Sequence, residues 1–336
     1  MSIDQLESIA QAMVAAGKGI IAIDESNATI KKRFDGVGVE NSEEHRRAYR
    51  EMLLTTPRLG EHISGAILYD ETLRQSTKAG VPFTKVMLDN GILPGIKVDK
   101  GPQPLAGFPG ELVTEGLDGL RERLKEYAAL GAKFAKWRAV ITIGEDMPSS
   151  TCIDANCHAL ARYAALCQEA GIVPMVEPEV LMDGSHDIEV CYDVTEVTLR
   201  SLFASLYEHN VMLEGTILKA SMVIAGKDCP EQAAVEEVAE ATVRCLKASV
   251  PASLPGIVFL SGGQSDEQAT AHLNAMNQMG PHPWPLSFSY GRAMQSAALK
   301  LWAKDMKANF AEAQKTVAAR ARDNGLAALG QWKKSA

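Results

Sequence analysis

The chain lacks the short motifs that mark several common classes of protein. Its six cysteines form no Cys-x-x-Cys pair, and its seven histidines show neither a His-Glu-x-x-His spacing nor another metal-ligand spacing. We therefore expect neither a disulfide framework nor a metal site. Reduced, structural thiols are the alternative, and they are typical of a reducing compartment.

Long apolar runs and an excess of basic residues are also missing. No stretch reaches the length of a transmembrane helix, and residues 1–16 are polar and amphipathic, without the apolar core of a signal peptide. Lys and Arg total 34 against 42 Asp and Glu, which leaves a net charge of −8. We predict a cytoplasmic protein with neither a nucleic-acid nor a membrane partner.

Eight short apolar runs recur along the chain and carry the main signal of its fold. They are rich in β-branched residues, are bounded by Gly, Pro or Asp, and are each followed by a longer helical pattern. This alternation is typical of an α/β protein with a parallel sheet, and eight strand–helix units predict a closed (β/α)8 TIM barrel. The expected strands are residues 19–24, 64–70, 95–99, 134–141, 172–180, 215–221, 256–262 and 286–292.

Helical patterns fill the intervals between the expected strands. They cover residues 44–55, 116–130, 153–170, 194–209, 231–248 and 266–279. No linker rich in Pro, Gly or Ser interrupts them, so we predict a single domain over residues 1–336. An extra helix at 3–16 precedes the barrel strands of residues 19–292, and a helical extension at 293–330 follows them. An open doubly wound sheet is the alternative, but the Gly-x-Gly-x-x-Gly turn after its first strand is missing.

Lys219 lies in an apolar run, residues 215–224, where a charged side chain is costly unless it is used. A buried ammonium group loses hydration worth several kcal/mol, and its usual response is a lowered pKa. A neutral amine at working pH is a nucleophile. The alternative is a lysine at a strand end whose ammonium group reaches solvent. This run alone leaves both interpretations open.

Other charged residues occur toward the carboxyl ends of the expected strands, which converge on one mouth of a barrel. Alternate residues of a strand share a face, so several of these residues form pairs on the same face. The set comprises Asp24, Lys97 with Asp99, Lys136 with Arg138, and Glu177 with Glu179. A solvated strand end or an internal ion pair would explain any one of them. Together they favour a reactive mouth, because buried ion pairs are often no more stabilising than apolar residues.

Glycine-containing turns follow the last two expected strands and predict a phosphate site. The turns are Ser261-Gly262-Gly263 and Ser289-Tyr290-Gly291-Arg292. Glycine lets backbone N–H groups approach a phosphate, the following helix adds its dipole, and arginine adds a fork of donors. Thr29 and Arg33, after the first strand, indicate either a second anion site across the mouth or a solvated helix start.

In combination these residues resemble class I fructose-bisphosphate aldolase, the Schiff-base family. The resemblance covers the chain from about Gly17 to Gly330. Its motifs are Gly17-Lys18-Gly19, Asp24-Glu25-Ser26, Gly95-Ile96-Lys97-Val98-Asp99-Lys100-Gly101, Phe134-Ala135-Lys136-Trp137-Arg138, Val176-Glu177-Pro178-Glu179, Leu218-Lys219, Leu260-Ser261-Gly262-Gly263-Gln264-Ser265 and Phe288-Ser289-Tyr290-Gly291-Arg292.

The resemblance implies a role for each site residue. Lys219 would attack the ketose carbonyl and form the Schiff base, and Glu177, with Glu179 nearby, would shuttle protons. Asp24 would take the proton of the C4 hydroxyl as the C3–C4 bond breaks. Substrate contacts and the electrostatics of the mouth would come from Lys136, Lys97 and Arg138. The C1 phosphate would be held by Ser261, Gly262, Gly263, Ser289, Gly291 and Arg292. The C6 phosphate would face Ser26, Thr29, Arg33 and Lys97.

The activity implied is reversible cleavage of fructose 1,6-bisphosphate to dihydroxyacetone phosphate and glyceraldehyde 3-phosphate, in glycolysis and gluconeogenesis. A protonated imine stabilises the carbanion, so no cofactor and no metal are required. The implied partners are phosphosugar substrates and further copies of the chain in a homo-oligomer, a tetramer or dimer. Two alternatives are a Schiff-base aldolase that prefers fructose 1-phosphate or another ketose phosphate, and a non-catalytic phosphosugar-binding scaffold.

Three features differ from familiar members of the family. Ala220 and Ser221 follow Lys219 where those members carry Pro and Asn, and Thr29 replaces a serine while keeping a hydroxyl group. The sequence ends at Ala336 without the tyrosine-bearing tail that assists proton transfer in animal forms. We therefore expect proton exchange at the enamine to depend on another group or on water.

Overall fold

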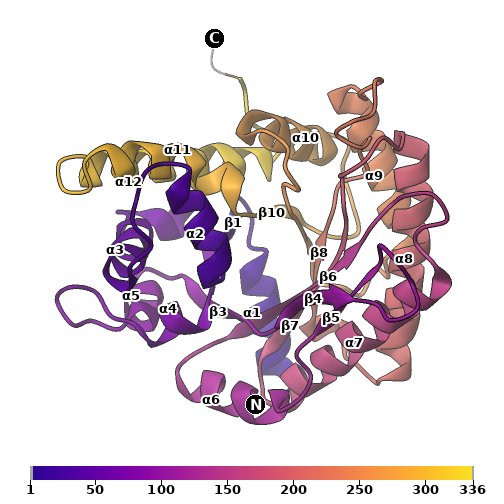
Figure 1. Cartoon of the computed structure of the whole chain (residues 1–336), viewed down its shortest axis with the longest axis horizontal. Coiled ribbons are helices and arrows are strands. Elements are labelled where there is room, and N and C mark those ends of the chain that lie inside the picture. The colour runs from indigo at the N-terminus through magenta and orange to yellow at the C-terminus, as the bar shows by residue number, and fades with distance from the viewer. Residues whose placement is uncertain (1–2, 335–336) are drawn as a thin grey trace.

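A closed barrel of eight parallel strands forms the centre of the computed structural model, which describes residues 3–334 (Figure 1). The strands close in the order β1-β10-β9-β8-β7-β6-β3-β2. Their bounds are β1 Gly19–Ile23, β2 Ile63–Leu68, β3 Leu93–Lys97, β6 Phe134–Ile141, β7 Val173–Val180, β8 Ile217–Ala220, β9 Ile257–Phe259 and β10 Leu286–Tyr290. All eight expected strands are present, so the predicted (β/α)8 barrel is confirmed.

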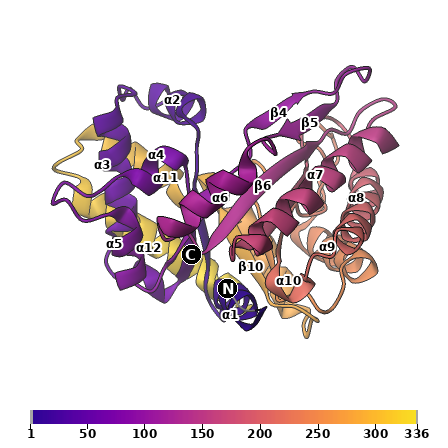
Figure 2. The same ribbon diagram turned by 90° about the horizontal axis from the view of Figure 1, so that it is seen from below.

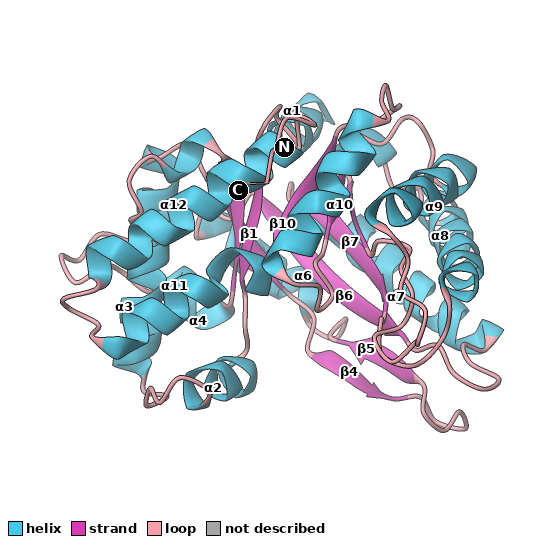
Figure 3. Cartoon of the chain, turned by 90° about the horizontal axis from the view of Figure 1, so that it is seen from above, coloured by secondary structure: helices cyan, strands magenta, loops and turns pink. Residues whose placement is uncertain are grey.

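Helices surround the barrel in two groups (Figure 3). One group gathers α2 Asn27–Asp35, α3 Glu43–Leu54, α4 Asp70–Arg74, α5 Phe83–Asp89, α11 Arg292–Lys304 and α12 Phe310–Ala327. The other gathers α6 Leu120–Ala129, α7 Ser150–Glu169, α8 Ile188–Glu208, α9 Val235–Ser249 and α10 Asp266–Gln278. The remaining pieces are α1 Ile3–Met13 and the short 3-10 helices η1 Leu59–Glu61 and η2 Leu213–Gly215. No helix within residues 3–334 has both the length and the apolarity to cross a membrane.

Several predicted helix bounds were wrong for local reasons. The helix expected from residue 116 begins at Leu120, because Gly116 and Gly119 adopt φ values of 132° and 67°. The helix expected from residue 194 begins earlier, at Ile188, where the Asp187 side chain accepts from the N–H of Val190 at 2.9 Å. The helical extension expected at 293–330 is present as two helices, α11 and α12, which are separated where the backbone becomes extended after Lys304.

A hairpin between β3 and β6 was not predicted. Its strands, β4 Gly101–Pro104 and β5 Leu112–Glu115, pair antiparallel outside the barrel (Figure 2). Thr114 donates from Oγ1 to the carbonyl of Arg138 at 2.8 Å, which places the hairpin against the second half of β6. Strands of four residues are too short for a clear alternating pattern, so periodicity alone did not indicate them.

An apolar layer fills the amino-terminal end of the barrel. Phe134 of β6 is fully buried there, and a Cβ atom built on Gly95 or Gly65 would lie within 2.2 or 2.9 Å of its ring. The two glycines therefore leave the space that the ring occupies. Helix α1 covers this end with Leu6 and Met13, which belong to the same buried cluster as Phe134.

Candidate active site

A cavity of about 470 Å³ opens at the carboxyl ends of the barrel strands. The structure brings nearly all of the predicted site residues to its walls. Those that line it are Asp24, Ser26, Thr29, Arg33, Lys97, Lys136, Arg138, Glu177, Glu179, Lys219, Ser261, Gly262, Ser289, Gly291 and Arg292. Gly263 does not line the cavity itself, but a Cβ built on it would lie 3.5 Å from Nη2 of Arg292.

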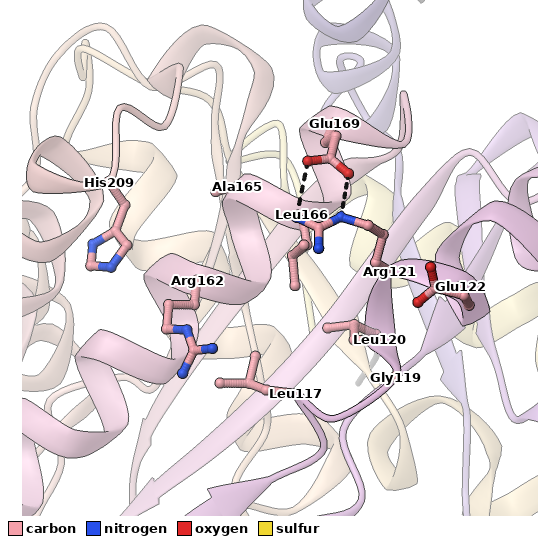
Figure 4. A pocket seen from close by; sticks show the side chains of 10 residues that line it. All are labelled: Leu117, Gly119, Leu120, Arg121, Glu122, Arg162, Ala165, Leu166, Glu169 and His209. Atoms are coloured by element: carbon pink, nitrogen blue, oxygen red, sulfur yellow. Dashed lines mark hydrogen bonds and ion pairs between the residues drawn. The ribbon is translucent and has the colours of Figure 1, made fainter.

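A second pocket, of about 350 Å³, lies outside the barrel beside α6 and α7 (Figure 4). Arg121 pairs with Glu169 there at 2.6 Å, and both side chains are more than half exposed. An exposed pair of this kind interacts weakly, because solvent screens it. None of the predicted site residues lines this pocket. The barrel mouth is therefore the candidate active site.

Two ammonium groups and two carboxylates alternate at the base of the mouth. Nζ of Lys219, on β8, lies 2.9 Å from Oε1 of Glu177, on β7. The other oxygen of Glu177 lies 3.3 Å from Nζ of Lys136, on β6. Lys136 also lies 2.8 Å from Oδ2 of Asp24, which follows β1 and reaches across the barrel. Glu177 thus lies between the two lysines and contacts both.

These four groups shift one another's pKa values strongly. Burial opposes ionisation of Asp24, but the ammonium groups of Lys136 and Lys219 outweigh that cost and hold the pKa of its carboxyl well below the usual range. The pKa of Glu177 is lowered in the same way, by Lys136, Lys219 and Arg138 against its burial. Burial disfavours the charged form of Lys136, but Asp24 and Glu177 raise its pKa above the ordinary value. Asp24, Glu177 and Lys136 are therefore charged at neutral pH.

A second set of charges stands above the first. Lys97 lies 2.8 Å from Oδ1 of Asp99, and Asp99 also accepts from the N–H of Arg138 at 3.1 Å. The guanidinium of Arg138 pairs with Glu179. Burial works against the charge of Arg138, but Glu179 raises its pKa above the ordinary value. These residues form the internal ion pairs that were the alternative interpretation, yet Lys97, Arg138 and Glu179 still line the cavity.

The turns after β9 and β10 form a cradle of glycine and polar residues at the edge of the cavity. Gly262 and Gly263 adopt φ values of 61° and 118°, which residues with a side chain rarely adopt. Ser289 is 1% exposed, and its hydroxyl has no hydrogen-bond partner in residues 3–334. Arg292 is the first residue of α11. A buried hydroxyl, a helix start and an arginine at one place are suited to phosphate.

The predicted second anion cluster divides into two parts. Ser26 and Thr29 lie 3.1 Å apart at the start of α2, with Ser26 as its N-cap and both side chains toward the cavity. Arg33, one helical turn further, pairs with Glu25, and a Cβ built on Gly291 would lie 3.9 Å from its Nη2. The structure therefore places Arg33 between the two predicted phosphate clusters, close to the cradle.

Sequence reasoning missed Glu25 and Lys32, which also line the cavity. Glu25 follows Asp24 directly, so face alternation on the strand did not point to it; β1 ends at Ile23, and the chain beyond it is irregular. The two unusual residues after the lysine have ordinary surroundings. Ala220 stays in register with Phe259 on β9, and Ser221 donates to the carbonyl of Val180 at 3.0 Å.

Comparisons with known proteins agree with this geometry. The family model for fructose-bisphosphate aldolase class-I matches residues 5–336. A probable fructose-bisphosphate aldolase class 1 of Xanthomonas campestris pv. campestris is 76% identical over 333 residues, 99% of this chain and 100% of the relative. A cytosolic fructose-bisphosphate aldolase 4 of Arabidopsis thaliana is 54% identical over 94% of this chain and 81% of its own. The solved fructose-bisphosphate aldolase of Plasmodium falciparum superposes with a TM-score of 0.97 at 49% identity, over 99% of this chain and 96% of that one.

Proposed function

The chain belongs to the class I fructose-bisphosphate aldolase family, and from the geometry of its mouth we propose which residues carry out the reaction. The protein is a lyase of the metal-independent class that uses a Schiff-base lysine. The observation that supports the assignment is the 2.9 Å contact between Lys219 and Glu177 on the floor of the cavity.

Lys219 is the proposed nucleophile, because its side chain is 5% exposed yet lines the cavity beside a carboxylate. Proton transfer from Nζ to Glu177 would free the amine lone pair, which attacks the C2 carbonyl of the ketose. The same carboxyl group would then return its proton to the carbinolamine oxygen, which leaves as water. The product is a protonated imine at C2.

Asp24 is the proposed base for carbon–carbon cleavage. Its pKa is depressed, so it stays ionised, and it accepts the proton of the C4 hydroxyl while the C4 carbonyl forms. The electrons of the C3–C4 bond move into the iminium, which becomes an enamine, and the aldehyde departs. Lys136 keeps Asp24 in position at 2.8 Å and offsets its charge.

The substrate is proposed to lie between the cradle and the start of α2. Ser261, Gly262 and Ser289 would hold the C1 phosphate together with Gly263, Gly291 and Arg292. Ser26, Thr29, Arg33 and Lys97 would meet the C6 phosphate. Two anion clusters favour fructose 1,6-bisphosphate over fructose 1-phosphate, and kcat/KM measured with both substrates tests this preference. Equal values would contradict it.

Borohydride trapping tests the assignment of Lys219. Reduction with sodium borohydride in the presence of dihydroxyacetone phosphate should label Lys219, as located by peptide mass spectrometry. Lys227→Met is a matched control, because Lys227 pairs with Asp183 outside the cavity. It should label like the unmodified chain, whereas Lys219→Met should not. Label on another lysine would overturn the assignment.

A cytoplasmic homo-oligomer, a dimer or tetramer, completes the proposal. The relative from Arabidopsis thaliana named cytosolic supports the location. Val190 and Val197 support the assembly, since they lie seven residues apart on α8 and are 41% and 48% exposed. Light scattering after size-exclusion chromatography measures the mass. A monomer at micromolar concentration would contradict the assembly.

A further inference from the structure

Three separate helices hold the carboxylate of Glu25 at the edge of the cavity. Arg33 of α2 contacts Oε1, and Nε2 of Gln295 on α11 donates to the same oxygen at 2.7 Å. Arg50 of α3 donates from Nη2 to Oε2 at 2.5 Å. Tyr49 fixes the amide of Gln295, because its hydroxyl donates to Oε1 of that residue at 2.8 Å. Glu25 thus connects α2, which borders the cavity, with α3 and α11.

The two arginines of this cluster differ in their surroundings. The side chain of Arg50 is 3% exposed, does not line the cavity and contacts Glu25 alone among the acidic residues in the described part of the chain. The side chain of Arg33 is 23% exposed and lines the cavity. One carboxylate therefore meets two guanidinium groups, and the cluster keeps one positive charge, on the side that faces the substrate.

Arg50 makes fewer bonds than its burial would favour. Its Nε and Nη1 are buried without a hydrogen-bond partner in residues 3–334. Leaving a buried donor unpaired costs about 1–3 kcal/mol, so stability alone gives a poor reason for this residue. The charge of Arg50 gives a better reason for its presence. A carboxylate of Glu25 that is already paired with Arg50 does not cancel the charge of Arg33.

The free end of Arg33 points toward the phosphate cradle. Its Nη1 pairs with Glu25, whereas a Cβ built on Gly291 would lie 3.9 Å from its Nη2. A guanidinium group presents donors on two edges, so one edge binds Glu25 while the other remains available to a phosphate oxygen. Orientation therefore comes from Glu25, and the charge that attracts a phosphate remains because Arg50 has neutralised Glu25.

We propose that Arg50 is a positioning residue for substrate binding: it neutralises Glu25, so that Glu25 can aim Arg33 at a phosphate group of the substrate without cancelling its charge. The inference rests on the proposed function, since it requires Arg33 to contact a substrate phosphate. Without the charge of Arg50, Glu25 and Arg33 would form a neutral pair, and the cluster would keep no positive charge for the phosphate.

Steady-state cleavage of fructose 1,6-bisphosphate tests the proposal with a matched pair of variants. Arg50→Gln and Arg50→Lys both keep a donor for Glu25, but only the lysine keeps the charge. We expect Arg50→Gln to raise KM by about tenfold with a smaller change in kcat, and Arg50→Lys to raise KM less. The double variant Glu25→Gln/Arg50→Gln removes both charges, so its KM should fall back below that of Arg50→Gln.

The rescue separates positioning from a structural role, because the loss of a second buried group should not repair damaged packing. Arg50→Met repeats the loss of charge with an apolar side chain if Arg50→Gln does not fold, as judged by thermal melting. A KM unchanged in both neutral variants would overturn the inference. A double variant with a KM as high as that of the single one would overturn it as well.

Arg33→Met distinguishes failure of this inference from failure of the proposed function. If Arg33→Met leaves KM unchanged, Arg33 does not contact a substrate phosphate, and the premise fails together with the inference. If Arg33→Met raises KM while the neutral Arg50 variants do not, only the role of Arg50 is wrong. A rise in both, with rescue in the double variant, supports the proposal.

Discussion

The two ends of the barrel differ in chemistry although the same strands form both. At the amino-terminal end Phe134, Met175 and Ile217 are fully buried in an apolar layer under α1. Two residues further along the same three strands stand Lys136, Glu177 and Lys219, which are almost as buried but ionisable. Alternate residues of a strand share a face, so both sets point into the barrel. Two residues along each strand therefore separate an apolar layer from an ionic layer.

This difference shows where the barrel is built for stability and where it is built for reaction. The apolar layer requires only close packing, and the glycines beside Phe134 leave the space that its ring fills. The ionic layer gains little net stability from its pairs, because desolvation offsets most of their attraction. Its value lies in groups whose protonation is controlled. Substitutions in the two layers should therefore separate activity from stability.

Lys219→Met should have the largest effect on activity. Removal of the proposed nucleophile is expected to lower kcat by about 10⁴-fold or more, as the loss of a group used in every covalent step does. Coupled assays of fructose 1,6-bisphosphate cleavage measure it. A kcat within tenfold of that of the unmodified chain would contradict the role of Lys219 as the nucleophile, and with it the catalytic role of the ionic layer.

Lys136→Met should reduce both activity and stability, because it leaves Asp24 and Glu177 without their shared cation. Removal of one partner from a buried pair costs about 3–5 kcal/mol, so denaturant unfolding should show a large loss. We expect kcat to fall by about 10²-fold or more as the base loses its orientation. Full stability in urea would contradict the ion-pair geometry.

Gly65→Ala tests the apolar layer. The added methyl would lie 2.9 Å from the Phe134 ring and 3.3 Å from the carbonyl of Leu93, so one of them must shift. We expect a loss of about 1–3 kcal/mol in the free energy of unfolding. Because Gly65 lies in β2 away from the ionic layer, kcat/KM at 25 °C should change far less than in Lys136→Met. A loss of activity without a loss of stability would remove the distinction between the layers.

Acid stability should depend on the ionic layer. The folded pKa of Asp24 and that of Glu177 lie below their unfolded values, so both carboxylates stabilise the fold above the unfolded pKa. That contribution is lost as pH falls through the unfolded pKa, near 4, toward the folded pKa. Asp24→Asn should flatten the dependence of stability on pH in this acidic window. The free energy of unfolding is measured at a series of pH values below pH 5, with Gly65→Ala as the control. The same dependence on pH in Asp24→Asn and in the unmodified chain would contradict the lowered pKa of Asp24.

Thr29→Ser should have the smallest effect, since it keeps the hydroxyl that lies 3.1 Å from Ser26. We expect less than about a twofold change in KM, whereas Thr29→Val, which has nearly the shape of threonine but no hydroxyl, should raise KM by about threefold to tenfold. Equal KM values for the two variants would show that the hydroxyl does not meet the substrate.

Much of the fold was predictable because its signals are local. Eight apolar runs with intervening helices indicated the barrel, and charges at strand ends indicated its mouth. The β4–β5 hairpin and the start of α6 were not predictable from periodicity. Four-residue strands carry too little pattern, and the helix start depends on the φ angles of Gly116 and Gly119.

By itself the sequence determined which groups stand at the mouth, since strand parity and strand ends are properties of neighbouring residues. Only the tertiary structure decided their partners: Lys136 with Asp24 across the barrel, Glu177 between two lysines, and Glu25 between Arg33 and Arg50. These contacts join residues from separate strands and helices. The contacts of Glu177 depend on the pairing of the neighbouring strands β6, β7 and β8. The contact of Lys136 with Asp24 spans the barrel, so it depends on the closed sheet that β1 and β10 complete.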